Sequence, residues 1–288
     1  MSAPLVSERI GQLVLGHDRL EYTEFGGGDR WVVLLHAQLM PRTMHDRLAR
    51  VLASEGLHVV TLDLLGHGRS DRPEDPREYS MSAFAEQVLG LLDHLGADEA
   101  VIGGTSLGAN VSLEVADLAP ERVRGMILEM PVLDNAVEAG ILVFAPLLFL
   151  ARFAPWTISA VTAATRLVPR RLAPHWVGVA LDTVGQRPRP MAATVHGLFF
   201  GRVAPSSRAR QRILAPALVV GHPHDPVHLA ADALMVAEEL PNATHVAASS
   251  ILEWRRRPER LDGEAIAFAV DVWDGPAATR AAGGPATS

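Results

Sequence analysis

Short apolar runs alternate with segments of helical periodicity along most of the chain. The runs that predict buried strands are Trp31–His36, His58–Leu64, Ala100–Ser106, Val123–Met130, Pro216–His222 and Thr244–Ser249. Apolar residues recur three or four positions apart at Phe84, Val88, Leu91, Leu92 and Leu95, at Val111, Val115 and Leu118, and at Ile266, Val270 and Trp273. This alternation predicts an α/β fold with a mostly parallel sheet flanked by helices.

One stretch departs from this rhythm. Residues 135–212 contain no clear strand pattern but hold apolar helical pieces separated by prolines. We expect a helical lid here, inserted between two parts of the core at residues 1–134 and 213–274, with residues 275–288 as a disordered tail. The apolar run Ala139–Ala151 is too short for a membrane span and Arg152 follows it, so we expect no stable membrane insertion. Contact of this run with a membrane interface is the alternative.

The composition narrows the possible function classes. The chain is 48% hydrophobic and 20% charged, which is typical of a globular enzyme. A net charge of -7 argues against nucleic acid as a partner, because phosphate binding needs clustered positive charge. The absence of cysteine excludes disulfides, a thiolate nucleophile and a Cys-ligated zinc site. The first residues lack a secretory signal pattern, so we expect a cytoplasmic protein. We expect no cofactor and no metal.

One motif carries recognisable chemistry. The segment GTSLG, Gly104–Gly108, fits the pattern G-x-S-x-G, and it lies between a predicted strand and a predicted helix. A sharp turn at that junction exposes the serine hydroxyl, and the helix N-terminus favours developing negative charge. The motif therefore predicts that Ser106 is a nucleophile at the carboxyl edge of the sheet.

With this motif, the chain resembles the α/β-hydrolase superfamily, in particular its lidded members such as esterases and epoxide hydrolases. LLHAQ (Leu34–Gln38) is similar to the family's strand and His-Gly turn, and DLLGHGRS (Asp63–Ser70) to the loop after the next strand. PALVVGHPHDPVH (Pro216–His228) resembles the segment that carries the acid of the catalytic triad. The resemblance implies an α/β-hydrolase fold with the lid between core strands.

The resemblance also implies roles for individual residues. Asp225 is the expected triad acid, and the backbone N–H groups of Gln38 and Leu107 are the expected oxyanion-hole donors. The sequence departs from the family at Ala37, where glycine is usual. His36 is expected to support this turn rather than to act as a base.

The family's triad histidine has no counterpart at its usual position, in the loop after the last strand. Counting back from Pro258 reaches Ile251, and no histidine follows Val246. His222, His224 and His228 lie in the acid loop at the correct edge, and we single out His224, beside Asp225, as the possible base. Glu129, at the end of its strand, is an alternative acid, although a carboxylate bonded to nearby backbone fits equally well. We therefore predict an incomplete triad in which Ser106 is well placed but poorly activated.

These features leave the function open between three classes. The first is a hydrolase that acts on a small hydrophobic ester or related carbonyl compound through Ser106. The second is a non-catalytic member of the fold that binds a small hydrophobic molecule or serves as a scaffold. The third uses the pocket for a non-hydrolytic reaction without a covalent intermediate. The sequence specifies no oligomeric state.

Overall fold

The computed structural model describes residues 6–133, 137–169, 173–199, 201–225 and 227–275. Its sheet has eight strands in the order β1-β2-β4-β3-β5-β6-β7-β8. The strands are β1 (Glu8–Leu15), β2 (Asp18–Phe25), β3 (Trp31–Leu35), β4 (His58–Leu62), β5 (Ala100–Thr105), β6 (Val123–Glu129), β7 (Ala217–Gly221) and β8 (Ala243–Ala247). All pairs from β4 to β8 are parallel, whereas β2 runs antiparallel to both β1 and β4. The predicted α/β fold with a mostly parallel sheet is confirmed.

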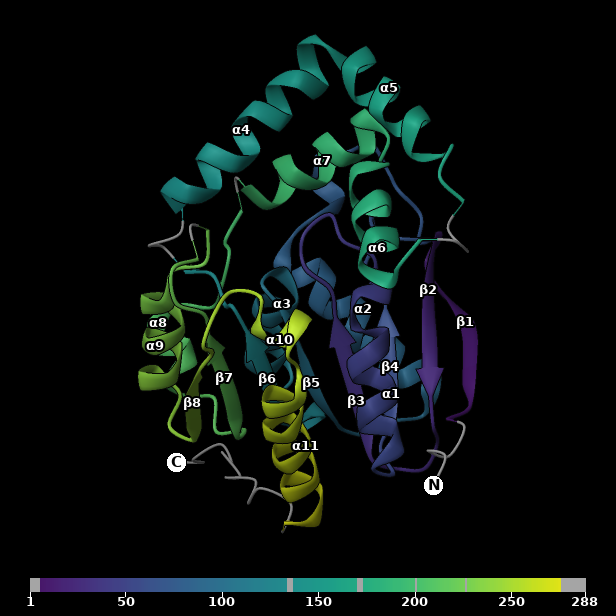
Figure 1. Cartoon of the computed structure of the whole chain (residues 1–288). Coiled ribbons are helices and arrows are strands. Elements are labelled where there is room, and N and C mark those ends of the chain that lie inside the picture. Colours follow the sequence, from purple (N-terminus) through teal and green to yellow (C-terminus); the bar gives the residue numbers. More distant parts are fainter. Residues whose placement is uncertain (1–5, 134–136, 170–172, 200, 226, 276–288) are drawn as a thin grey trace, which may run out of the picture.

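Helices cover both faces of this sheet (Figure 1). The core helices are α1 (Asp46–Ser54), α2 (Met81–Leu95), α3 (Leu107–Leu118), α9 (Ala230–Glu239), α10 (Glu253–Arg256) and α11 (Glu259–Asp274), with short 3-10 turns at Arg42–His45, Pro76–Glu78 and Pro120–Arg122. Successive strand residues point to opposite faces, so Val32 and Leu34 pack with α1 and α11, while Val33 and Leu35 pack with α2 and α3. Burial on both faces explains why these strands are continuous apolar runs in the sequence.

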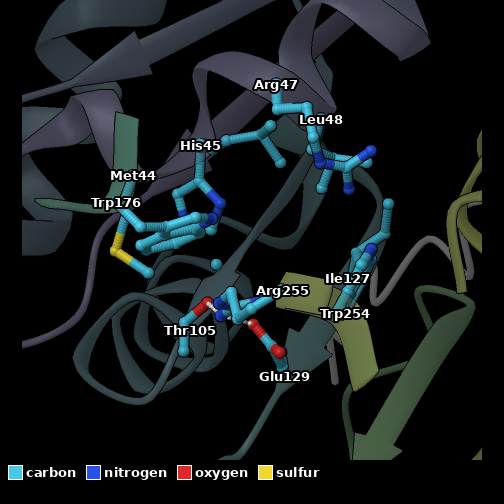
Figure 2. Close-up of a pocket in the computed structure, with 12 residues that line it drawn as sticks. Met44, His45, Arg47, Leu48, Thr105, Ile127, Glu129, Trp176, Trp254 and Arg255 are labelled. Atoms are coloured by element: carbon cyan, nitrogen blue, oxygen red, sulfur yellow. Dashed lines mark hydrogen bonds and ion pairs between the residues drawn. The ribbon is translucent and has the colours of Figure 1, made fainter. Parts of the chain in front are cut away.

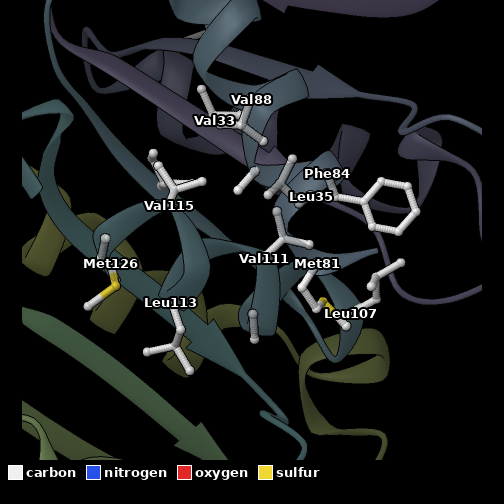
Figure 3. Packing of buried hydrophobic residues seen from close by; sticks show 14 of the residues in the cluster. Val33, Leu35, Met81, Phe84, Val88, Leu107, Val111, Leu113, Val115 and Met126 are labelled. Atoms are coloured by element: carbon white, nitrogen blue, oxygen red, sulfur yellow. The ribbon is translucent and has the colours of Figure 1, made fainter. Parts of the chain in front are cut away.

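The best-packed layer lies between β3, α2 and α3. Figure 3 shows Val33 and Leu35 meeting Val88 of α2 and Val111 of α3, all fully buried. Ten of the twelve residues of α3 are buried. This packing fixes the helix that begins directly after Ser106.

The N-terminal hairpin of β1 and β2 was not predicted from the sequence. β1 exposes most of its side chains, and its apolar residues, including the exposed Ile10 and Val14, do not alternate cleanly with polar ones. It is an edge strand held mainly by its ladder with β2, and so carries a weak periodic signal.

Between β6 and β7 the chain forms a helical layer above the sheet (Figure 1). Its helices are α4 (Val137–Phe153), α5 (Pro155–Thr165), α6 (His175–Val184) and α7 (Pro188–Phe199). The next helix, α8 (Ser207–Arg210), packs on α3 and α9 of the core instead, so the lid layer ends with α7. Of the expected tail, 275–288, only Gly275 falls inside the described residues.

The helices of the lid are apolar, but none of those described passes as a membrane span by itself. No helix in the described ranges is both long and apolar enough to cross a bilayer. The pair Leu142–Phe153 and Pro155–Thr165 has the required length and composition together, but the two helices are bent by 101° at the break.

Candidate active site

Ser106 forms a sharp turn between β5 and α3. Its backbone has φ 54° and ψ -107°, a strained conformation for a residue with a side chain. A Cβ atom at Gly104 or Gly108 would lie 2.2 or 2.1 Å from the Leu35 carbonyl oxygen, so the approach of this turn to β3 requires glycine on both sides. The N–H of Ser106 donates to the carbonyl of Glu129 at 2.8 Å, which ties the turn to β6. Ser106 thus has the predicted position at the carboxyl edge of the sheet.

A histidine and a carboxylate line up with the Ser106 hydroxyl. His228 Nε2 lies 2.9 Å from Ser106 Oγ, and His228 Nδ1 lies 3.0 Å from Asp225 Oδ2. Because an ionised carboxylate only accepts hydrogen bonds, Nδ1 carries the hydrogen and donates to Asp225, which leaves Nε2 free to accept from Ser106. Burial by itself raises the pKa of Asp225, but hydrogen bonds from His228 and from the N–H of Val227 outweigh it and lower the pKa to about 2. Asp225 is therefore ionised at neutral pH.

This geometry corrects the prediction that Ser106 lacks a base. The count that reached Ile251 assumed that the base must come from the loop after the last strand. The histidine that hydrogen-bonds Ser106 instead lies in the loop after β7, three residues beyond Asp225, where the N–H groups of Val227 and His228 both donate to Asp225 Oδ1 and curl the loop back. Ile251 is partly exposed in the loop after β8.

The structure also corrects the choice of His224 as the candidate base. His224 is exposed and has a left-handed backbone with φ 59°, and the histidine within hydrogen-bond distance of Ser106 is His228. His36 supports the turn as expected: its Nε2 accepts from the N–H of Leu64 at 3.0 Å, and its Nδ1 donates to the Ala37 carbonyl at 2.9 Å. Burial lowers the pKa of His36, which keeps the ring neutral.

The expected oxyanion donors line the same cavity as Ser106. Gln38 and Leu107 are both wall residues there, and neither backbone N–H has a hydrogen-bond partner among the described residues. The substitution of alanine for glycine at Ala37 is tolerated because the left-handed residue of this turn is Leu39, with φ 63°. Gln186, in the lid, donates from Nε2 to the Leu39 carbonyl at 2.5 Å and so braces the turn.

Glu129 is part of a buried ionic network beside the turn rather than the partner of His228. Arg255 donates to Glu129 Oε2 at 2.6 Å, as does the Thr105 hydroxyl at 2.5 Å. His222 Nε2 lies 3.2 Å from Glu129 Oε1, within ion-pair distance but misaligned for a hydrogen bond. Burial alone raises the pKa of Glu129, but Arg255 and His222 outweigh it and hold that pKa below its usual range.

Figure 2 shows Thr105, Glu129 and Arg255 of this network. Trp176 of α6 covers it, with its ring 5.4 Å from the Arg255 guanidinium carbon. Arg255 lies on the short helix α10, in the segment after β8 where the family's triad histidine was expected. That loop therefore supports Thr105, next to the nucleophile, instead of contributing the base.

The cavity in front of Ser106 is apolar. It has a volume of about 130 Å³ between the core and the lid helices α4 and α7. Its walls are Gln38, Met81, Ser106, Leu107, Asn110, Val132, Gly140, Phe144, Val195, Leu198 and Val203. The Asn110 side chain donates to the carbonyls of Val132 and Val203 and accepts from the N–H of Val132, so its polar atoms are occupied. A ligand in this cavity meets mainly hydrocarbon.

Several residues of the site were missed from the sequence. Arg255 and Gln186 lie in no motif, and Thr105 occupies a position of G-x-S-x-G that the motif leaves open to any residue. For His228 a signal was available: the spacing of Asp225 and His228 suits a tight turn that returns the imidazole to its own acid. In the described part of the chain, no three His, Asp or Glu side chains are grouped closely enough to hold a metal ion.

Several known proteins with related sequences are named as hydrolases, and others are named as a haloalkane dehalogenase and as an acetyltransferase component. The chain is 40% identical over 76 residues to a 2-hydroxymuconate semialdehyde hydrolase of Pseudomonas putida, which covers 26% of this chain and 27% of that protein. It is 32% identical over 131 residues to the zearalenone hydrolase of Cladophialophora bantiana, covering 44% and 49% of the two chains. A 44% identical match over 129 residues is the dihydrolipoyllysine-residue acetyltransferase component of an acetoin cleaving system of Pseudomonas putida, covering 44% of this chain and 32% of that one. The chain thus matches half or less of the length of these relatives.

The same fold occurs in solved structures. An enol-lactonase of Burkholderia xenovorans LB400 has a TM-score of 0.72 at 21% identity, over 90% of this chain and all of that one. A sequence profile for the alpha/beta hydrolase fold matches residues 30–249, which is well over half of the chain. The chain therefore belongs to the α/β-hydrolase fold family.

Proposed function

We propose that this protein is a serine hydrolase that cleaves a small hydrophobic ester or a related carbonyl compound. The observation that carries the proposal is the hydrogen-bonded series from Ser106 through His228 to Asp225. It is the arrangement that a serine needs to become a nucleophile at neutral pH. Proteins with the same fold whose names specify an esterase or an enol-lactonase support this class of reaction.

In the proposed reaction, His228 Nε2 takes the hydroxyl proton as Ser106 Oγ attacks the substrate carbonyl. The N–H groups of Gln38 and Leu107 stabilise the negative charge that develops on the carbonyl oxygen. The proton passes from His228 to the departing alcohol as the bond to it breaks. Water then repeats the sequence on the acyl group, which leaves as a carboxylic acid and restores Ser106.

The apolar cavity sets the proposed substrate class. Phe144, Val195 and Leu198 offer no partner for a charge, so a charged acyl group would lose its hydration without compensation. A series of p-nitrophenyl esters of increasing acyl length tests this point. We expect kcat/KM to rise with the first added methylenes, and a preference for charged acyl groups would contradict the apolar assignment.

Labelling by a serine-directed fluorophosphonate tests the catalytic series itself. We expect stoichiometric labelling of the unmodified protein and none of Ser106→Ala. His228→Ala removes the base and is expected to lower kcat on the order of 10⁴-fold or more. His224→Ala is the matched control, because this exposed histidine lies on the same loop, and its kcat should stay within about twofold.

The non-catalytic alternative makes the opposite forecast. A binding or scaffold protein would show no labelling above that of Ser106→Ala and equal, negligible turnover in the His228 and His224 variants. Absent labelling together with equal, negligible turnover would contradict the proposed hydrolase function.

A further inference from the structure

A second cavity, of about 690 Å³, lies between the core and the lid. None of its wall residues is shared with the cavity in front of Ser106. The core contributes Arg42, Arg69 and Arg72, and the lid contributes Arg166 and Arg187. Five arginines and three acidic residues line it, a surplus of positive charge in a chain whose net charge is -7.

Two of the three acidic residues share one arginine of the wall. Arg42 binds Asp63 at 2.5 Å and Glu21 at 2.8 Å. In contrast, neither Arg69 nor Arg187 has a carboxylate partner in the described ranges, and the same is true of Arg166. The positive surplus therefore lies on three exposed guanidinium groups that have no carboxylate partner among the described residues.

Arg72 forms hydrogen bonds with both the core and the lid. Its Nη1 donates to Gln186 Oε1 at 3.2 Å, and its Nη2 donates to the Gly68 carbonyl at 2.5 Å. Burial lowers the pKa of Arg72, and the nearby Arg187 and Arg69 lower it further against the opposing effect of Asp63. Like charges thus converge on a partly buried arginine, which is unfavourable unless an anion offsets them.

We propose that this cavity is a binding site for a small molecule bearing a phosphate or carboxylate group, held mainly by Arg72 and Arg187. Guanidinium groups suit this ligand because their planar N–H forks match the oxygens of phosphate and carboxylate. Arg69 and Arg72 belong to the core loop, whereas Arg166 and Arg187 flank the lid helices α5 and α7. A bound anion therefore bridges the two layers.

The site is also connected to the loop beside the nucleophile. Gln186 accepts from Arg72 with one end of its amide and donates to the Leu39 carbonyl with the other. Leu39 has a left-handed backbone and directly follows Gln38, the proposed oxyanion donor. An anion bound to Arg72 is thus connected to the turn that contains Gln38 through the side chains of Arg72 and Gln186.

Calorimetric titration of the full chain with inorganic phosphate, and separately with citrate, tests the proposal. We expect saturable binding of at least one of them and a rise in Tm that sodium chloride at equal ionic strength does not produce. Which anion binds more tightly distinguishes a phosphate from a carboxylate ligand. Arg187→Gln and Arg72→Gln should each weaken binding by about tenfold or more, because each removes a charge-assisted hydrogen bond.

Two controls keep the result interpretable. Arg208→Gln changes an exposed arginine of α8 outside the cavity and should leave the affinity unchanged. Ser106→Ala should also bind the anion normally, so failure of the proposed hydrolase activity does not affect this test. Equal effects of chloride and phosphate would overturn the proposal, as would unchanged binding by Arg187→Gln, whose exposed side chain is not needed for folding.

Discussion

At the scale of a single residue, the backbone and the side chain of Gln38 both face questions of hydrogen bonding at the site. Its backbone N–H is a proposed oxyanion donor, and both polar atoms of its side chain are buried without a partner in the described part of the chain. The same side chain lines the apolar cavity in front of Ser106. A buried amide without partners costs about 1–3 kcal/mol of stability, and a polar group on a ligand in this cavity would supply the missing partner.

Gln38→Leu tests that role. We expect the variant to be more thermally stable, because it removes an unsatisfied amide from apolar surroundings at similar volume. We also expect loss of preference for an ester with a hydroxyl on its acyl chain over the unsubstituted ester. The measurements are Tm by calorimetry and the ratio of kcat/KM for the ester pair. A lower Tm with an unchanged ratio would show that the amide supports the loop and does not read the substrate.

At the scale of elements, the sequence predicted the buried strands and helices best, because burial gives their apolar residues a regular spacing. The parallel strands and the turn at Ser106 follow directly from apolar runs and the spacing of Gly104 and Gly108. Prediction failed where position depends on the path of a loop. His228 reaches Ser106 only because Asp225 folds its own loop back, and no periodic pattern encodes that return. The hairpin of β1 and β2 was missed because its exposed edge strand lacks a buried face.

Helix α1 supplies a pH-dependent contribution to stability. Burial raises the pKa of Asp46, its first residue, to about 7 from an ordinary value of 3.8. Between these values the folded state holds a proton that the unfolded state has lost, so this group makes stability fall as pH rises from about 4 to 7. The full effect is about 4 kcal/mol at most.

Asp46→Asn should remove this dependence. We expect the variant and the parent to have similar Tm values near pH 4, and the variant to be more stable near pH 8. Calorimetric scans of both proteins across this range give the difference directly. A variant that loses stability at pH 8 would indicate that the ionised carboxylate stabilises α1, for example through Arg50, which lies 3.9 Å away.

At the scale of the whole molecule, the core and the lid differ in how much apolar surface they bury. The central strand β5 and helix α3 are almost entirely buried. The lid exposes large apolar side chains, among them Leu142, Phe149, Phe153 and Trp156. Its buried apolar residues, Ala151, Ile158, Met191 and Val195, form one small cluster with Leu39 of the core. The site therefore lies between a rigid layer that positions Ser106 and a layer held by few contacts.

Hydrogen exchange should reveal this division. Only three residues of α5 and one of α6 are buried, against ten of α3, so local opening of the lid exposes little apolar surface and costs little free energy. We expect amides in α5 and α6 to exchange at least about tenfold faster than those of β5 and α3, as followed by mass spectrometry of peptides. A covalent phosphonate on Ser106 should slow exchange in α4 and α7, which line the cavity, and leave α11 unchanged as an internal control. Uniform exchange across lid and core would mean that the two layers unfold as one cooperative unit, and the apolar surface of the lid would then need a different explanation.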